Sequence, residues 1–135
     1  MGTITLRWVE SNLMVGTDSS GHSIVIGKSP EDKTFIGIKP SDLLLMATAS
    51  CTMYDVTEIL VKQREPLEDL KISCSGDQLA DPPYTFTRIH LHYTVRGAVN
   101  PVKLEKAIRL SEDKYCSVLS TLRLAIPVTS DYEIL

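Results

Sequence analysis

Alternating apolar and polar residues predict a small β-sheet at the start of the chain. In the segment 3–9, three apolar side chains, the last of them Trp8, share one face of a strand, and polar side chains occupy the other. Two shorter strand-like runs follow at 13–17 and 23–26. The turn sequence Asp-Ser-Ser-Gly lies between them, so the two runs are expected to form a hairpin.

The period changes at Pro40, which suits the first turn of a helix because its missing N–H is not needed there. Ser41 and Asp42 add polar groups that stabilise a helix start. The segment 43–61 contains no Gly or Pro, and its first three turns are apolar almost all round. Such a helix, about 36 Å long if it ends at Pro66, should be buried on all sides. We therefore expect it to cross the centre of something larger than one subunit, because one chain of this size has a radius of gyration of about 14 Å.

The second half of the chain predicts two more strands, two further helices and a closing strand. The apolar side of the strand at 85–96 is formed by alternate residues that include Tyr93. Pro101 starts a second helix, and Ser111 followed by two acids indicates a new helix start. A closing strand begins near Leu124. The order β-β-β-α-β-β-α-α-β predicts a single α+β domain over 1–135, with antiparallel sheets packed on a long helix.

Composition narrows the class of protein. The 135 residues are 43% apolar and 23% charged, which argues against disorder. A net charge of −3 leaves no basic excess for nucleic acid. The longest uncharged stretch, 43–54, is too short to span a bilayer. The N-terminal sequence does not resemble a secretory signal, so a cytoplasmic location is expected.

Three cysteines are the main candidates for chemistry. An odd number, none arranged as Cys-x-x-Cys, argues against a disulfide framework or a zinc site. Cys51 lies in the apolar helix, where a cysteine is usually a small core residue. Cys116 lies near the start of a short helix, whose dipole favours a thiolate, so reactive and structural roles both stay open. Cys74 is on the apolar side of a strand and is expected to be structural.

Two histidines, His90 and His92, share the polar face of one strand. Their spacing is compatible with metal binding, but no nearby residue supplies a third ligand, and Arg88 and Arg96 share the same face. We therefore expect a solvated polar face and no metal site. Neither a glycine-rich phosphate loop nor a serine nucleophile elbow is present, so no cofactor is expected.

Three segments together resemble the OsmC/Ohr family. The segment 40–56, PSDLLLMATASCTMYDV, is similar to the family's central helix, in which a Pro, one or two acids, a Leu/Ala run and a Cys follow in this order. The segment 89–97 is similar to a family strand, and 107–118 to the segment of the second Cys. The early Leu-rich helix and the short length are most similar to the OsmC-like subgroup that includes YhfA-type proteins.

This resemblance implies an intertwined homodimer whose two long helices are buried centrally. It implies that Cys51 and Cys116 meet at a pocket built from both subunits. The family chemistry is thiol-dependent reduction of organic hydroperoxides in defence against oxidative stress. Cys51 matches the attacking thiol, which becomes a sulfenic acid, and Cys116 matches the resolving thiol, which forms a disulfide. An external dithiol then reduces that disulfide.

The family's peroxidases also use a Glu and an Arg to hold the thiolate and orient the peroxide. Here the Glu position falls on Ser41, with Asp42 one residue later, and no Arg lies between Arg7 and Arg64. Arg7 and Lys39 are the candidate donors of positive charge. These departures keep an alternative open, which is a dimer of the same fold that binds a small apolar or thiol-containing ligand without peroxidase activity.

Overall fold

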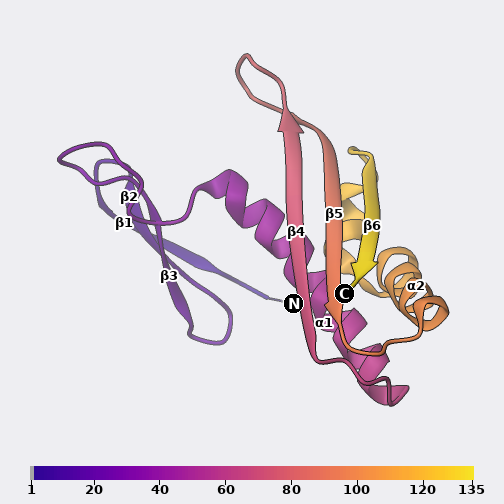
Figure 1. The fold of residues 1–135 in the computed structure, drawn as a ribbon. Helices are drawn as coiled ribbons and strands as arrows, with labels where there is room; N and C mark the ends of the chain where they lie inside the picture. The colour runs from indigo at the N-terminus through magenta and orange to yellow at the C-terminus, as the bar shows by residue number, and fades with distance from the viewer. Residues whose placement is uncertain (1) are drawn as a thin grey trace. The chain divides into compact units, whose positions relative to one another are not determined.

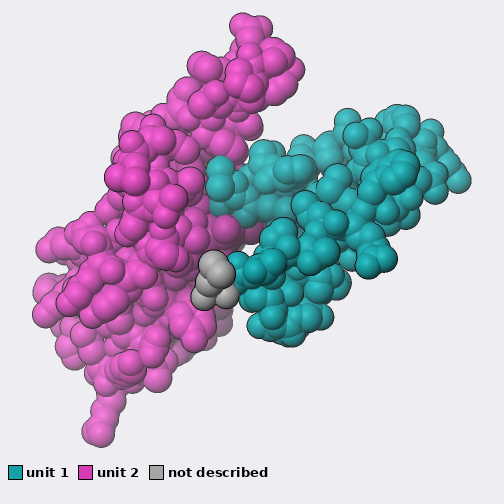
Figure 2. Space-filling model, turned by 180° about the vertical axis from the view of Figure 1, so that it is seen from behind, with its two compact units in different colours: residues 1–44 teal, residues 45–135 magenta. Residues whose placement is uncertain are grey.

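The computed structural model describes residues 2–135 and shows an α+β protein made of two compact units, residues 1–44 and 45–135 (Figures 1 and 2). The predicted order of strands and helices is confirmed. The boundary between the units falls inside helix α1 (Pro40–Lys62), which belongs to both. That the two units function as one domain stays a prediction.

Unit 1 contains the three predicted strands as one antiparallel sheet in the order β1-β2-β3. These are β1 (Thr5–Glu10), β2 (Leu13–Thr17) and β3 (Ser23–Gly27). The predicted apolar side chains of the first strand are all exposed, with Ile4 at 63%, Leu6 at 55% and Trp8 at 71%. Unit 1 therefore has apolar side chains that a single chain leaves in water.

Helix α1 buries one row of side chains at four-residue spacing, which are Thr48, Thr52, Val56 and Leu60. This spacing places the row on one face of a helix. The helix ends at Lys62, four residues before Pro66, because Arg64 turns into the left-handed region with a φ of 55°. The N–H groups of Arg64 and Glu65 then bond to the carbonyls of Val61 and Leu60, which closes the helix without a glycine.

One face of α1 is exposed within a single chain, so the predicted burial of the helix on all sides would need a partner and stays a prediction. Met46, Tyr54 and Val61 are 52%, 74% and 66% exposed. Because an α-helix turns by about 100° per residue, these three side chains lie within a stripe about 80° wide on its surface. By length and composition alone, α1 is long and apolar enough to cross a membrane. The core helix of a soluble protein meets the same criteria.

Unit 2 is a three-stranded sheet covered on one face by helices (Figure 1). Its strands are β4 (Asp69–Gln78), β5 (Phe86–Arg96) and β6 (Val128–Ile134). β4 and β5 are antiparallel, whereas β6 lies parallel to β5, so this sheet is mixed. The predicted core face of β5 is confirmed, since Ile89, Leu91, Tyr93 and Val95 have no exposed surface. Leu91, Tyr93 and Val95 pack with Val56 and Leu60 of α1.

The segment between α2 (Pro101–Leu110) and β6 differs from the prediction. Ser111 does not cap a new helix, because the chain continues from α2 into a single π-helical turn, η1 (Ser111–Tyr115). The new helix, α3 (Ser117–Leu122), starts only after Cys116. The closing strand begins at Val128 rather than near Leu124, which is 88% exposed.

Candidate functional site

The structure brings Cys51 and Cys116 together, although they are 65 positions apart in the sequence. Cys51 is half-buried on α1, and Cys116 has no exposed surface at the start of α3. The Cys51 side chain packs against the core cluster that contains Cys116 and is close enough to raise the pKa of the Cys116 thiol. Both are free cysteines, so the pair is a reduced dithiol.

The π-helical turn sets the position of Cys116. Its backbone N–H donates to the carbonyl of Ser111 at 2.8 Å, the wide bond of a π turn. With φ −75° and ψ 105°, Cys116 leaves the helical path and becomes the N-cap of α3. Its sulfur accepts a hydrogen bond from the N–H of Leu119 at 3.4 Å. The thiol is thereby fixed at its own helix start.

Burial, the largest cause, and the neighbouring Cys51 thiol together raise the pKa of the Cys116 thiol to about 12. The hydrogen bond from the N–H of Leu119 lowers the pKa of Cys116, but by less than burial raises it. Taking a thiol out of water disfavours its charged form. Cys116 therefore keeps its proton at neutral pH.

A polar network lies beside the pair on the buried side. Tyr93 donates a hydrogen bond of 3.4 Å to Glu112, whose carboxylate pairs with Arg123 at 3.3 Å. The hydroxyl of Thr52 is a second hydrogen-bond partner of Tyr93, and Tyr93 interacts electrostatically with Cys116. Burial, its largest cause, raises the pKa of Tyr93 well above the ordinary 10, so the phenol stays a neutral donor.

Sequence reasoning missed this network. Glu112 reads as an acid in the first turn of a helix, yet its side chain is 11% exposed and pairs with Arg123. Arg123 also donates to the Glu112 carbonyl at 3.0 Å and to Asp113 at 2.9 Å. The chain thus contains an Arg–Glu pair whose carboxylate is largely buried, but at positions that no family motif predicts.

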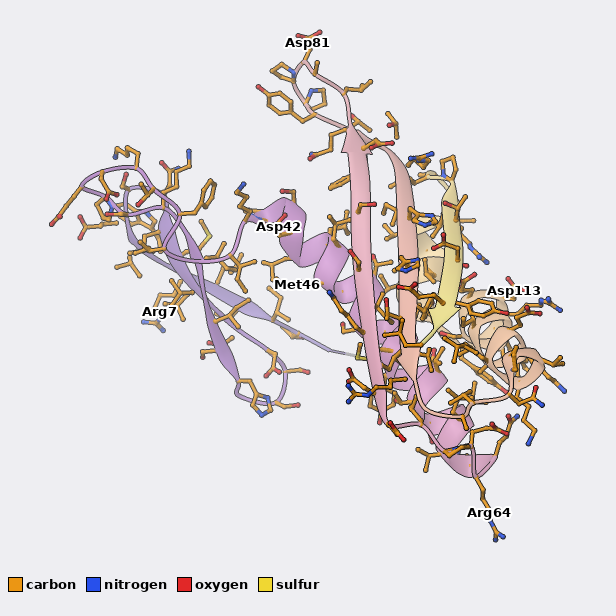
Figure 3. The ribbon with its side chains drawn as sticks, viewed as in Figure 1. Arg7, Asp42, Met46, Arg64, Asp81 and Asp113 are labelled. Atoms are coloured by element: carbon orange, nitrogen blue, oxygen red, sulfur yellow. The ribbon has the colours of Figure 1, made fainter. Side chains whose placement is uncertain are left out.

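The four supporting residues predicted from the family all lie in unit 1, whereas both cysteines lie in unit 2. Ser41 and Asp42 are in the first turn of α1, about 14 Å before Cys51 along the helix axis, which is too far for contact within one chain. Figure 3 shows Asp42 at this helix start and Arg7 on β1. The ammonium of Lys39 lies over the ring of Phe35 at 5.1 Å. Roles for these four residues stay predictions.

Cys74 lies apart from the pair, on β4 opposite Leu91. It is half-buried and packs against the core. Burial raises the pKa of its thiol, which disfavours the reactive thiolate. These observations favour the structural role expected for Cys74.

The two histidines form a ladder with β6 on the polar face of the sheet. Asp131 accepts from both, at 3.0 Å from His90 and 2.6 Å from His92, and Glu133 lies 3.3 Å from His92. Within residues 2–135, no group of three or more His, Cys, Asp or Glu side chains could hold a metal ion. The ladder is therefore a network of hydrogen bonds on an exposed face.

This ladder predicts a pH dependence. The hydrogen bond to Asp131 is the largest cause that raises the pKa of His92 above its ordinary 6.5, with Glu133 second. Because the folded pKa is raised, this stabilisation is complete below pH 6.5 and is lost as the pH rises through the folded value. We expect Asp131→Asn to lower the pKa of His92 in an NMR titration, and Glu133→Gln to lower it less. An unchanged pKa in Asp131→Asn would contradict this assignment.

Comparison with solved structures identifies the fold. A crystal structure of an OsmC-like protein from Mycoplasma pneumoniae superposes with a TM-score of 0.85 at 16% identity, covering 100% of this chain and 97% of that one. The organic hydroperoxide resistance protein OhrB of Bacillus subtilis superposes with a TM-score of 0.63 at 16% identity, covering 98% of each chain. The chain therefore has the OsmC fold.

Sequence comparison then gives the family. The profile described as OsmC-like protein matches residues 30–131. Protein YhfA of Escherichia coli strain K12 is 33% identical over 130 residues, which cover 96% of this chain and 95% of YhfA. The chain belongs to the OsmC-like family, as its two cysteine segments predicted.

Proposed function

We propose that this protein is a thiol-dependent peroxidase that reduces organic hydroperoxides with Cys51 and Cys116. The observation that carries the proposal is the pair of neighbouring free thiols, formed by two segments distant in sequence. Two neighbouring thiols can be oxidised to one disulfide.

The surroundings of the two thiols support different roles. Cys116 has no exposed surface and keeps its proton, so it is poorly suited to attack a peroxide from solvent. Cys51 is half-buried and is the more accessible member of the pair. We therefore assign the attack to Cys51 and the resolution to Cys116.

The proposed reaction needs no cofactor. The Cys51 thiolate attacks the distal peroxide oxygen, the O–O bond breaks, and the alkoxide leaves as an alcohol after taking a proton. The Cys116 sulfur then attacks the sulfenic acid on Cys51, and the proton that Cys116 retained leaves with the hydroxyl as water. An external thiol reductant restores the dithiol, a step that suits the reducing cytoplasm.

Structures with the same fold support the proposed peroxidase activity. Among the structures with this fold is a protein titled for organic hydroperoxide resistance, from Bacillus subtilis. The likeness to that protein is one of fold, and the thiol pair of this chain is what carries the chemistry. The Arg123–Glu112 pair, whose carboxylate is largely buried, supplies a charged network near Cys116, where the family's peroxidases use an Arg and a Glu from other positions.

A homodimer is part of the proposal. The exposed stripe of α1 and the exposed apolar side chains of β1, Trp8 above all, need a cover that one chain does not provide. A second copy of the chain presents matching apolar faces and can bury both stripes about a two-fold axis. The unusual length of α1 then has a physical reason.

Thiol titration tests the proposed function. Reaction with one equivalent of cumene hydroperoxide should remove two of the three titratable thiols per chain, and dithiothreitol should restore them. A ligand-binding dimer without peroxidase activity would keep all three thiols. Loss of one thiol alone would contradict the resolving role of Cys116.

A further inference from the structure

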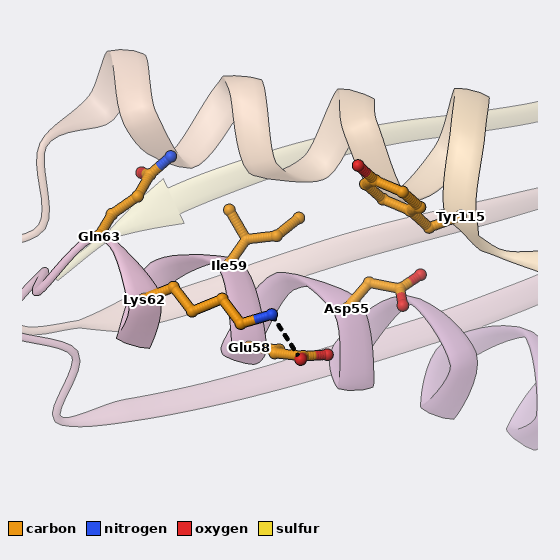
Figure 4. A pocket seen from close by; sticks show the side chains of 6 residues that line it. All are labelled: Asp55, Glu58, Ile59, Lys62, Gln63 and Tyr115. Atoms are coloured by element: carbon orange, nitrogen blue, oxygen red, sulfur yellow. Dashed lines mark ion pairs between the residues drawn. The ribbon is translucent and has the colours of Figure 1, made fainter.

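A pocket of about 560 Å³ runs along α1 on the side of η1 (Figure 4). It is lined by Asp55, Glu58, Ile59, Lys62, Gln63 and Tyr115. All six belong to unit 2. The pocket lies beyond Cys51 in the direction of the C-terminal end of α1, whereas the family's Glu and Arg positions lie before Cys51.

The pocket is connected to the thiol pair by sequence spacing and by hydrogen bonds. Cys51, Asp55, Ile59 and Gln63 follow one another at four-residue spacing, so the row that lines the pocket starts at the reactive cysteine. Asp55 accepts a hydrogen bond of 2.9 Å from the hydroxyl of Ser111, whose carbonyl accepts the N–H of Cys116. A ligand at Asp55 is therefore one helical turn, roughly 6 Å, from Cys51.

The pocket lining contains a carboxylate that forms no ion pair with a cationic side chain in the described part of the chain. Glu58 and Lys62 neutralise each other in an ion pair of 2.8 Å. Across residues 2–135, no ion pair joins Asp55 to a Lys, Arg or His side chain. The Oε1 atom of Gln63, at the other end of the pocket, is buried without a hydrogen-bond partner in the described part of the chain. Among the described residues, the pocket thus has a carboxylate near the cysteines that no ion pair neutralises.

We propose that this pocket binds the small thiol that reduces the oxidised Cys51–Cys116 pair, and that Asp55 selects a thiol carrying a protonated amine. This inference rests on the proposed function, because it concerns the disulfide which that reaction forms. An ammonium group beside Asp55 would gain a charge-assisted hydrogen bond. An apolar hydroperoxide would gain little from this carboxylate.

The reduction balances with two thiols. The first thiol, as its thiolate, attacks the sulfur of Cys51, which is the more accessible one, and the Cys51–Cys116 bond breaks. Cys116 takes up the proton that the incoming thiol lost, which its strong affinity for a proton favours. A second thiol attacks the mixed disulfide, releases the oxidised small molecule and leaves Cys51 reduced.

Cysteamine and 2-mercaptoethanol are a matched pair of probes, since an ammonium in one replaces a hydroxyl in the other. The protein is oxidised with diamide, so that the test does not depend on peroxide chemistry, and reduction by each thiol is followed by rapid alkylation and mass spectrometry. Asp55→Asn keeps an oxygen for Ser111 but removes the charge. Asp81→Asn, at the tip of the β4–β5 loop, is the control with the same change in net charge (Figure 3).

We expect Asp55→Asn to slow reduction by cysteamine about tenfold, and to leave reduction by 2-mercaptoethanol unchanged. Asp81→Asn should change neither rate. Comparing each thiol across variants removes the difference in intrinsic reactivity between the two thiols. Equal slowing of both thiols, or no slowing, overturns the inference while leaving peroxide-driven disulfide formation intact. Failure of peroxide to form the disulfide overturns the proposed function instead, and failure of diamide to form it overturns both.

Discussion

Replacing Cys51 with Ser should abolish peroxide consumption. The variant loses the accessible thiol of the pair, and a neutral serine hydroxyl cannot replace a thiolate as nucleophile at neutral pH. Cys116 should not take over, because it has no exposed surface and its pKa is raised to about 12. Single-turnover reaction with cumene hydroperoxide, followed by mass spectrometry, should show no oxidation at Cys116.

Replacing Cys116 with Ser should act one step later. The first oxidation of Cys51 should survive, but the sulfenic acid has no internal partner. It should be trapped by dimedone and should proceed to the sulfinic acid when peroxide is in excess. Turnover should fall unless a small external thiol enters the pocket.

Cys74→Ser is the matched control for both variants. It should leave the chemistry unchanged and cost about 1–3 kcal/mol of stability if the new hydroxyl lacks a partner. A sulfenic acid on Cys116 in the Cys51→Ser protein would show that the two roles are reversed.

Introducing a charge into the exposed stripe of α1 should separate the dimer. Tyr54 is 74% exposed in a single chain, so Tyr54→Glu removes little packing within the chain. In the proposed dimer, the same change places two unpaired carboxylates at the interface, which should weaken association by roughly 4 kcal/mol, or about a thousandfold. Sedimentation of the wild type should give about twice the 15.0 kDa of one chain, and the variant should dissociate and unfold at a lower temperature.

Lys106→Glu, on the exposed side of α2, is the control for this experiment. It lowers the net charge by two units, one more than Tyr54→Glu does, at a place away from the stripe, and should leave the dimer intact. A wild-type protein that sediments as a folded monomer at micromolar concentration would remove the explanation for the length of α1 and for the exposed apolar face of β1.

The fold was largely predictable because its elements have strong local signals. Strict alternation identified the core face of β5, and the change of period at Pro40 identified the start of α1. The parallel pairing of β6 carries no such signal, because the same alternation fits either strand direction. The π turn was also missed, since the sequence Ser-Glu-Asp at 111–113 favours a helix start equally well.

The site was predictable only in part. The two cysteines followed from the family resemblance, and their contact agrees with it. The polar network around Tyr93 did not follow from it. Thr52, Glu112 and Arg123 come from α1, η1 and the end of α3, and only the folded chain brings them together. Gln63 likewise gave no sign in the sequence, since a polar residue near a helix end is expected to face water.

Peptide mapping of the oxidised protein tests the central claim most directly. After one equivalent of cumene hydroperoxide, free thiols are alkylated, and the protein is digested without reduction. The account predicts one linked peptide that joins Cys51 to Cys116 within a single chain, with Cys74 fully alkylated. A disulfide that includes Cys74, or a Cys51 that is still alkylated, would contradict it.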